Sequence, residues 1–214
     1  MSQIKLVVFD MDGTIIEPRS SWAMIHDYFG TDNTEMLQMY IDHKISDKEF
    51  VKADIKLWNS KSDVPVNEEY INSILDKAKP RKGAEELITS LHEANIKTII
   101  LSGGIQYLAD KWAKEWNMDD ALANDLIDDK SGNLTAIIKS SGHNKGPVME
   151  KMIEKYNFNK NEIAAVGDTV VDIPTFERAG LSIAVNTEDE RVISKANYHL
   201  KGDLTELKSL ILNW

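Results

Sequence analysis

Short apolar runs alternate with longer amphipathic stretches along most of this chain. Four runs consist mainly of apolar residues and cover residues 6–9, 98–101, 163–166 and 182–185. None of them alternates strictly between apolar and polar positions, which predicts strands covered on both faces. Between the runs, apolar residues recur at helical spacing in residues 83–94, 105–116, 147–156 and 173–179. The alternation of strand and helix predicts an α/β fold whose core is a doubly wound, Rossmann-like parallel sheet.

Residues 18–80 interrupt this alternation because they contain no convincing strand. Helical patterns cover residues 21–29, 35–43, 47–58 and 67–79, and Ser46 with Glu49 has the spacing of a capping box. We therefore predict a core domain of residues 1–16 and 81–214, and a small helical cap domain of residues 17–80 inserted after the first strand. A second, smaller insertion is predicted at residues 126–140, where Asp128 to Asn133 has the composition of a hairpin turn.

Composition narrows the class of protein. The chain has 214 residues, of which 42% are hydrophobic and 28% charged, as in a packed globular protein. A formal net charge of −10 argues against nucleic acid or an anionic membrane as partner. The chain has no cysteine, which excludes disulfides and thiolate metal sites. The first apolar run is too short for a signal peptide and no stretch approaches a membrane span, so we expect a cytoplasmic protein.

Two aspartates follow the first predicted strand, at the sheet edge where α/β proteins bind ligands. Asp10 and Asp12 are two residues apart, so their carboxylates are able to face one ligand. One carboxylate is a competent nucleophile toward phosphorus, and the other is able to serve as general acid and then as general base. The alternative is that both cap a turn. The apolar strand before them and Gly13-Thr14 after them favour the catalytic pair.

Three further clusters follow the later strands. Ser102, Gly103 and Gly104 suit an anion-binding nest, or equally a strand-to-helix turn capped by Ser102. Lys145 lies at the start of a predicted helix, where it opposes the helix dipole, so we expect an anion beside it in preference to a solvated lysine. His143 has no visible partner and is interpreted as an ordinary loop histidine.

The last cluster adds two more carboxylates. Asp168 and Asp172 follow the strand at residues 163–166, and Asp172 is also placed to cap the next helix. A carboxylate that faces Asp10 and Asp12 needs a cation to tolerate the charge. Oxygen ligands favour Mg²⁺, which also bridges phosphate oxygens, whereas zinc is disfavoured because no histidines have ligand spacing.

Together, these clusters resemble the four motifs of the haloacid dehalogenase superfamily, and the helical insert resembles the cap of its phosphoserine phosphatase branch. The residues that carry the resemblance are Asp10-Met11-Asp12-Gly13-Thr14, Leu101-Ser102-Gly103-Gly104, Lys145, and Gly167-Asp168 with Asp172. The resemblance implies a Mg²⁺-dependent phosphatase. In it, Asp10 attacks phosphorus and forms an aspartyl-phosphate, and Asp12 protonates the leaving alcohol and then activates water.

The resemblance also implies the binding roles. Ser102 and the Gly103 N–H would hold the phosphoryl oxygens, and Lys145 would neutralise Asp10 and the phosphate. Mg²⁺ would be bound by Asp10, Asp168 and the main-chain oxygen of Asp12, with Asp172 as a ligand or in support. The presence of Asp12 argues against a dehalogenase, because that reaction has no leaving alcohol to protonate.

The cap departs from the phosphoserine branch. That branch places an acid shortly after the first motif and an arginine in the cap. By ungapped spacing this chain has Arg19 and Asp54 at those places, with Glu17 two residues before Arg19. Asp54 lies four residues after Phe50 and four before Trp58, and with Trp22 these residues would make an aromatic and acidic pocket for a cationic head group such as phosphocholine or phosphoethanolamine. From the sequence we favour the simpler interpretation, in which Trp58 packs in the cap and Asp54 faces water.

Three functions are compatible with these residues. We favour a phosphatase that acts on a small phosphorylated metabolite. A phosphotransferase would use the same intermediate with a second alcohol as acceptor, and a non-catalytic phosphate-binding protein would not need an acid at Asp12. The sequence alone defines neither the substrate nor the oligomeric state.

Overall fold

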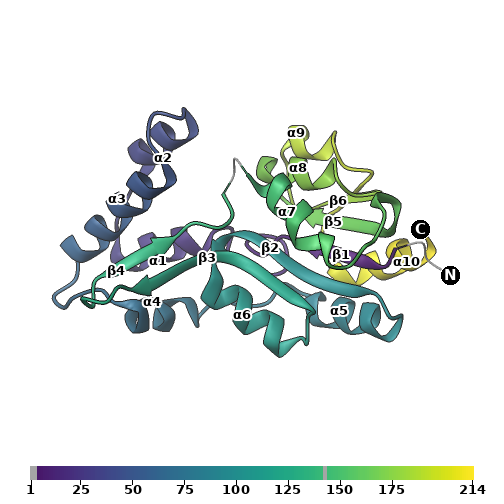
Figure 1. Ribbon diagram of the computed structural model, residues 1–214, viewed down its shortest axis with the longest axis horizontal. Helices are drawn as coiled ribbons and strands as arrows, with labels where there is room; N and C mark the ends of the chain where they lie inside the picture. Colours follow the sequence, from purple (N-terminus) through teal and green to yellow (C-terminus); the bar gives the residue numbers. More distant parts are fainter. Residues whose placement is uncertain (1–3, 142–143) are drawn as a thin grey trace.

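The computed structural model describes residues 4–141 and 144–214, and within them seven strands form one sheet. The strands are β1 (Leu6–Phe9), β2 (Lys97–Ile105), β3 (Asp120–Asp128), β4 (Leu134–Ile137), β5 (Ile163–Gly167), β6 (Leu181–Val185) and β7 (Tyr198–Leu200). Their order across the sheet is β4-β3-β2-β1-β5-β6-β7 (Figure 1). All neighbouring pairs are parallel except β3 and β4. The central strand β1 therefore carries the first motif into the middle of the sheet's carboxyl edge.

Helices cover both faces of the sheet. One layer contains α5 (Ala84–Glu93), α6 (Gln106–Glu115) and α10 (Leu207–Asn213), and the other contains α7 (Lys145–Glu154), α8 (Ile173–Phe176) and α9 (Glu190–Ile193) (Figure 1). In β1, Val7 and Phe9 pack into the first layer, whereas Leu6 and Val8 pack into the second. Because side chains alternate across a strand, both faces of β1 are apolar and buried. The predicted doubly wound α/β fold is confirmed.

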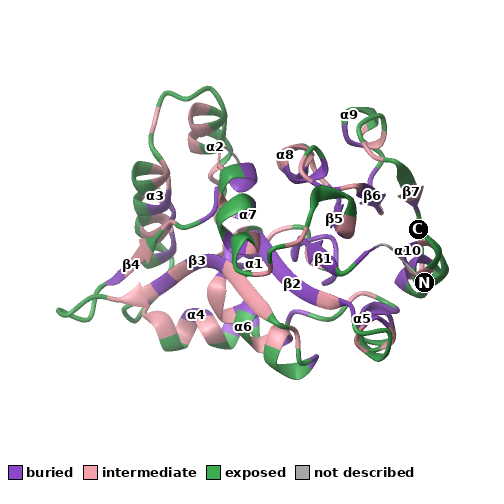
Figure 2. Cartoon of the chain, turned by 45° about the vertical axis from the view of Figure 1, so that its right-hand side comes forward, coloured by how far each residue is buried: buried purple, intermediate pink, exposed green. Residues whose placement is uncertain are grey.

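The segment between β1 and α5 is helical, as predicted. It contains α1 (Ser21–Phe29), α2 (Thr34–Ile41), α3 (Asp47–Ser60) and α4 (Glu68–Leu75). The predicted capping box is present, since Ser46 and Glu49 bond reciprocally at the start of α3. Helix α1 packs against α3, α4 and β2, and α3 reaches β4 (Figure 1). Ile25, Trp58 and Ile71 belong to the same apolar cluster as the sheet, while α2 buries no side chain (Figure 2). The division into two domains stays a prediction.

The predicted hairpin insertion is wrong in extent. A hairpin does form, but its first strand begins at Asp120 and pairs in parallel with β2 before it pairs with β4. The first strand of the hairpin is therefore a strand of the main sheet, and it extends past the end of β2 to pair with β4. Only two side chains of β3, Ala123 and Leu126, are buried in the apolar core, so this strand lacks the continuous apolar run that marks the central strands.

Other differences concern short elements. Strand β2 extends to Ile105, helix α8 ends at Phe176 rather than Ala179, and α7 begins at Lys145 rather than Pro147. The elements β7, α9 and α10 were not predicted, because each has only three to seven residues and one or two buried side chains. Three short 3₁₀ helices complete the fold: η1 (Lys160–Glu162), η2 (Val170–Asp172) and η3 (Leu204–Glu206). His143 lies outside the described residues.

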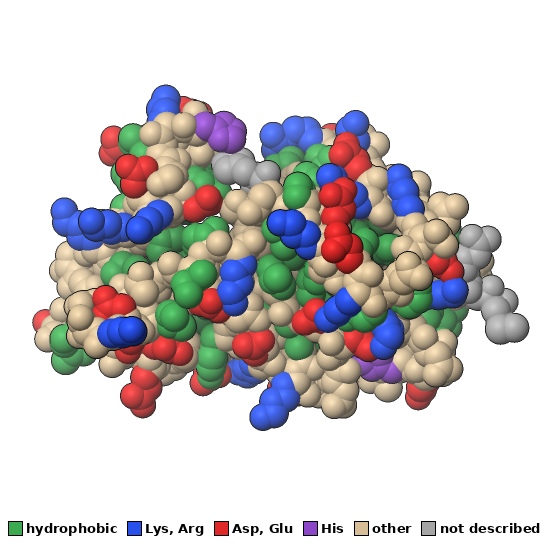
Figure 3. Space-filling view, in the orientation of Figure 1, with side chains coloured by type: hydrophobic (Ala, Val, Ile, Leu, Met, Phe, Trp, Pro, Cys, Tyr) green, Lys and Arg blue, Asp and Glu red, His purple; other side chains and the backbone are tan. Residues whose placement is uncertain are grey.

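The surface carries both signs of charge. Lys and Arg side chains are interspersed with Asp and Glu over the face shown in Figure 3. Along the upper edge of that view the surface has two protrusions, one formed by α2 and α3 and the other by α8 and α9. Among the described residues, no helix combines the length and apolar character that a membrane crossing requires.

Candidate active site

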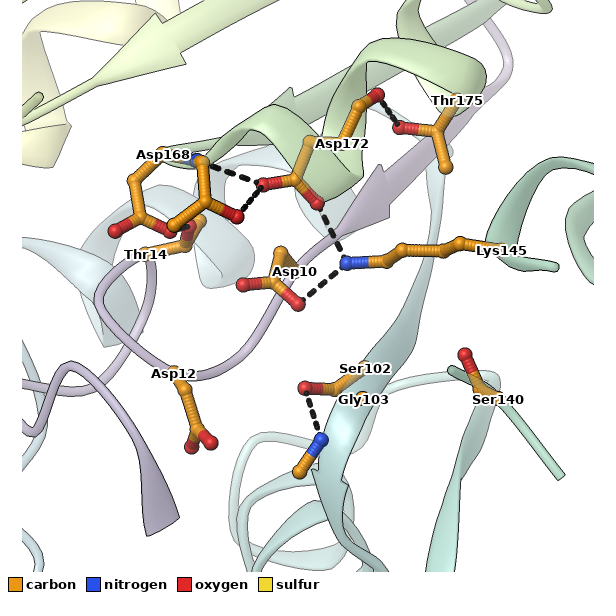
Figure 4. A network of polar contacts seen from close by, with 12 residues as sticks. Asp10, Asp12, Thr14, Ser102, Gly103, Ser140, Lys145, Asp168, Asp172 and Thr175 are labelled. Carbon is orange, nitrogen blue, oxygen red and sulfur yellow. Dashed lines mark hydrogen bonds and ion pairs between the residues drawn. The ribbon is translucent and has the colours of Figure 1, made fainter. Parts of the chain in front are cut away.

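The four predicted clusters converge at one edge of the sheet. Asp10 and Asp12 follow β1, Ser102 lies in β2, Lys145 opens α7, and Asp168 with Asp172 follows β5 (Figure 4). Because β1 lies between β2 and β5, the carboxyl ends of these three strands are adjacent. Side chains that are up to 162 positions apart in the sequence therefore meet in one site.

Lys145 is the buried cation of this site. Its side chain is 2% exposed, and its Nζ donates to Asp10 Oδ1 at 2.6 Å and to Asp172 Oδ1 at 2.5 Å. The alternative of a solvated lysine is therefore wrong. Burial lowers the pKa of Lys145, but the charges of Asp10 and Asp172 outweigh this effect, so the pKa lies above its ordinary value. The ammonium group thus stays charged and holds both carboxylates in place.

Asp172 organises the loop after β5. Its Oδ2 accepts hydrogen bonds from the backbone N–H groups of Asp168 and Thr169, each at 3.0 Å. Since Oδ1 is bound to Lys145, both oxygens are already engaged. Asp168 is held from the other side, because Thr14 Oγ1 donates to its Oδ1 at 3.1 Å. Asp172 therefore fixes the position of Asp168, and its own oxygens are less available to another ligand.

Three carboxylates of the site are close enough to share a cation. Oxygen atoms of Asp10, Asp168 and Asp172 all lie within 4.8 Å of one another. Burial, and then the charge of Asp172, raises the pKa of Asp168 to about 7. Burial likewise raises the pKa of Asp10, against the opposing charge of Lys145. One lysine does not balance three carboxylates, and the donors are all oxygen, so the residues fit a hard divalent cation such as Mg²⁺.

The Asp12 side chain points away from this cluster (Figure 4). Its Oδ2 accepts from the backbone N–H and the hydroxyl of Ser21, both at 2.7 Å. Its Oδ1 is buried and accepts no hydrogen bond from the described residues. Burial raises the pKa of Asp12, and the hydrogen bonds from Ser21 only partly oppose this. A carboxyl group that holds its proton more tightly is suited to act as a general acid. The predicted metal contact through the Asp12 main-chain oxygen stays a prediction.

Gly104 sets the position of Asp12. A Cβ at this residue would lie 2.6 Å from Asp12 Oδ2 and 2.7 Å from Ser21 Oγ. We expect Gly104→Ala to displace the Asp12 carboxylate and to lower kcat about 10²-fold, since small misplacements of a catalytic group have effects of this size. Steady-state kinetics on the folded variant, with circular dichroism as the fold control, provide the measurement. Wild-type kcat in the variant would contradict this role of Gly104.

The turn after β1 brings Gly13 against the carboxylate of Asp168. Gly13 has φ of +74°, and a Cβ there would overlap the Asp168 carboxylate. The guanidinium group of Arg81, in the segment between α4 and α5, donates to the Gly13 carbonyl oxygen at 2.7 Å and so holds the turn. Gly13 is therefore required for both its backbone conformation and the close approach of Asp168.

The segment from Ser102 to Gly104 leaves regular strand pairing. The register between β2 and β3 shifts between Leu101 and Ile105, and β1 pairs with β2 only as far as Ile100. Ser102 Oγ accepts from the Gly104 N–H at 3.1 Å, and Ile105, not Ser102, is the N-cap of α6. The Ser102 hydroxyl thus lies on the Asp10 side of the site without capping the helix (Figure 4), whereas the Gly104 N–H is engaged in holding that hydroxyl.

A cavity of about 850 Å³ extends from these residues to the helical insert. Its described lining includes Asp10, Asp12, Ser102, Gly103, Arg19 and Asp54. Glu17 is exposed and is not among the described lining residues. Trp58 is completely buried behind the cavity and stacks on Trp22, with ring centroids 6.3 Å apart. Of the predicted cap residues, Arg19, Trp22 and Asp54 therefore line the cavity.

The favoured interpretation of Asp54 is wrong. Its side chain is only 1% exposed, so it does not face water. Helix α3 turns Asp54 inward together with Val51 and Trp58, which are also buried. These three residues are three or four positions apart and share one helix face. Trp58 does pack in the core, as expected.

Several supporting residues were not identified from the sequence. Ser21 orients Asp12, and Thr14 and Arg81 support Asp168 and Gly13. Asn124 ties the site to β3, since its amide donates to the carbonyl oxygens of Gly103 and Ser140 at 2.9 and 2.7 Å. Only Thr14 carried a sequence signal, through its place in the first motif. The others depend on contacts between distant segments.

Comparison with known proteins gives a consistent result. Residues 4–180 match the family model of haloacid dehalogenase-like hydrolases. A phosphoserine phosphatase of Archaeoglobus fulgidus is 31% identical over 86% of this chain and 53% of its own length. A phosphoserine phosphatase of Methanocaldococcus jannaschii is 27% identical over 84% of each chain. The chain thus spans about half of the first relative and most of the second.

Solved structures are similar over nearly the whole chain. A substrate-bound phosphoserine phosphatase is 27% identical and has a TM-score of 0.79, with 97% of this chain and 98% of that chain covered. A phospho-aspartyl intermediate analogue of phosphoserine phosphatase is 26% identical, also with a TM-score of 0.79, over 97% and 99% of the two chains.

Proposed function

This chain belongs to the haloacid dehalogenase-like hydrolases, and from that premise we propose that it is a Mg²⁺-dependent phosphatase of a small phosphomonoester. The observation that supports this most is the meeting of Asp10, Lys145 and Asp168 at one sheet edge, next to Asp12. A nucleophile, a fixed cation, a set of oxygen ligands and a separate carboxyl group are the parts that phosphoryl transfer through an aspartate needs.

In the proposed mechanism, Asp10 is the nucleophile. Lys145 holds Asp10 Oδ1, whereas no described group hydrogen-bonds to Oδ2, so Oδ2 is the oxygen free to attack phosphorus. The bond between phosphorus and the ester oxygen breaks, and Asp12 gives its proton to the departing alcohol. Asp12 then takes a proton from water as the water attacks the phosphorus of the aspartyl-phosphate. Inorganic phosphate leaves and the Asp10 carboxylate is restored.

The remaining residues bind and orient. We assign the Ser102 hydroxyl and the Gly103 N–H to the phosphoryl oxygens, with Gly104 in support because its N–H holds the Ser102 hydroxyl. Lys145 is assigned to the charge shared by Asp10 and the phosphate. Asp10 and Asp168 would hold Mg²⁺, with Asp172 in support because its oxygens are already engaged. The ion would supply positive charge to the phosphate and to Asp10. A cytoplasmic location and a small phosphorylated metabolite as the partner stay predictions.

Removal of the metal provides the test. We expect EDTA to abolish hydrolysis of a panel of phosphomonoesters and Mg²⁺ to restore it. O-phosphoserine is the first member of that panel, because the relatives are named for it. At one hundred times its Kd, Mg²⁺ should also increase the free energy of unfolding by about 2.7 kcal/mol. The melting temperature should rise accordingly. Asp168→Asn should lose most of this shift. Full turnover of the panel in EDTA would refute the proposal.

A further inference from the structure

Asp54 is a buried carboxylate at the cap side of the active-site cavity. It is 1% exposed and belongs to the same cavity lining as Asp10 and Asp12. Its Oδ1 accepts from His26 Nε2 at 2.9 Å and from the Asn33 side-chain amide. Its Oδ2 is buried, and no group in the described residues donates to it. A buried carboxylate oxygen without a donor is costly, so a ligand that supplies an N–H there would be stabilised.

The contacts of His26 show that it does not supply a positive charge. Trp58 Nε1 donates to His26 Nδ1 at 3.2 Å, and the Thr31 hydroxyl, which is able to donate, lies 2.7 Å from the same nitrogen. An indole N–H is a donor only, so Nδ1 accepts and carries no proton. In the tautomer that accepts this hydrogen bond, the imidazole proton is on Nε2, which donates to Asp54 Oδ1, and the ring supplies no positive charge. The short contact between His26 and Asp54 is therefore a hydrogen bond from a neutral donor.

Among the described residues, no lysine or arginine forms an ion pair with Asp54. Asn33 is neutral, and the only ion-pair partner found for Asp54 within the described residues is His26. The described cavity lining adds three more acids on the same side, Asp27, Asp32 and Asp47. The other cationic lining residues are Arg19, which is exposed, and Arg191, which is paired with Asp189. A negative charge that is buried with only neutral donors favours a cationic ligand.

We propose that Asp54 binds a primary ammonium group of the substrate, so that the enzyme prefers phosphomonoesters that carry one. This rests on the proposed phosphatase activity and adds the substrate class. The ammonium supplies both the missing charge and the missing N–H donor for Oδ2. A trimethylammonium group would supply charge without a donor and is therefore the poorer ligand. O-phosphoethanolamine and O-phosphoserine share the required chemistry.

A pair of nearly isosteric substrates tests the preference. O-phosphoethanolamine and 2-hydroxyethyl phosphate differ mainly by an ammonium group in place of a hydroxyl. We expect wild-type kcat/KM to be at least roughly tenfold higher for the ammonium substrate, and higher for it than for phosphocholine. Equal values for the isosteric pair, or a preference for phosphocholine, would overturn the proposal without any variant.

The variant Asp54→Asn removes the charge and keeps the shape. It should reduce the preference to about one by raising KM for the ammonium substrate. Asp63→Asn makes the same charge change on an exposed part of the insert and should keep the wild-type preference. An unchanged preference in Asp54→Asn would overturn the proposal.

Two further comparisons distinguish failure of the ammonium assignment from failure of the proposed phosphatase function. Asp54→Asn should lower kcat/KM for O-phosphoserine and for O-phosphoethanolamine by similar factors, because the two share the ammonium and the phosphate. A loss confined to O-phosphoserine would overturn the ammonium assignment. If no phosphomonoester is hydrolysed with Mg²⁺, including an aryl phosphate, the proposed function itself fails. Hydrolysis of all of them without an ammonium preference rejects only the present inference.

Discussion

Asp10→Asn is expected to reduce phosphatase turnover by on the order of 10⁴-fold or more while the fold survives. An amide oxygen is a far weaker nucleophile than a carboxylate. Asp172 is the other described carboxylate bonded to Lys145, but its second oxygen already accepts two backbone hydrogen bonds, so it does not replace Asp10. Asparagine has nearly the same shape and is still able to accept from Lys145. Single-turnover and steady-state assays with Mg²⁺ measure the loss, and trapping of labelled phosphoenzyme measures the intermediate.

The stability of this variant is an internal control. Burial raises the pKa of Asp10 in the folded state. At pH values above the ordinary pKa of a carboxyl group, the ionised Asp10 side chain therefore lowers the stability of the metal-free protein. A neutral amide removes that cost, and Lys145 keeps its contact with Asp172 at 2.5 Å. We expect the metal-free melting temperature to stay within a few degrees of wild type. Retained turnover in the folded variant would refute Asp10 as the nucleophile.

The central strands and the catalytic clusters were predictable because their signals are local. Strand β1 is a short run that is buried on both faces, and Asp10 follows it directly. The backbone at a strand end determines where such a side chain points, whatever surrounds it. In the observed strand order β1 lies between β2 and β5, and this order brings Lys145 and Asp168 to Asp10.

The parts that were missed depend on contacts between distant segments. Strand β3 is only partly buried, so its pairing with β2 from Asp120 leaves little trace in its composition. Asn124 within it binds Gly103 and Ser140 through its amide, and Ser21 binds Asp12 from the first turn of α1. A single polar residue has no sequence period, and therefore the pattern of the chain does not reveal its partner.

Asp54 shows the same limit in the helical insert. Its spacing from Phe50 and Trp58 was visible in the sequence, but a helix face does not tell whether it meets water or protein. The burial of Asp54 follows from the position of α1, which brings His26 against it. The inserted helices thus differ from the sheet: helix positions were predictable, whereas the environment of each face was not.

Lys145→Met is the second change with a large expected effect, and it acts on both stability and activity. Methionine fills a similar space, but the variant leaves the buried carboxylates of Asp10 and Asp172 without a cation. Removing one partner of a buried ion pair typically costs about 3–5 kcal/mol. For a chain of this size that corresponds to a melting temperature lower by roughly 10 °C without metal. Turnover should fall about 10²–10³-fold because the phosphate loses a fixed positive charge.

A double variant separates the electrostatic cause from lost packing. In Lys145→Met with Asp172→Asn, one of the two unpaired charges is gone, so part of the lost stability should return. Thermal melts of the four proteins form the cycle, and a positive coupling of about 1 kcal/mol or more is expected for residues in contact. Mg²⁺ should narrow the gap between Lys145→Met and wild type, since Asp10 regains a cation. Strictly additive effects would show that Lys145 acts through packing alone.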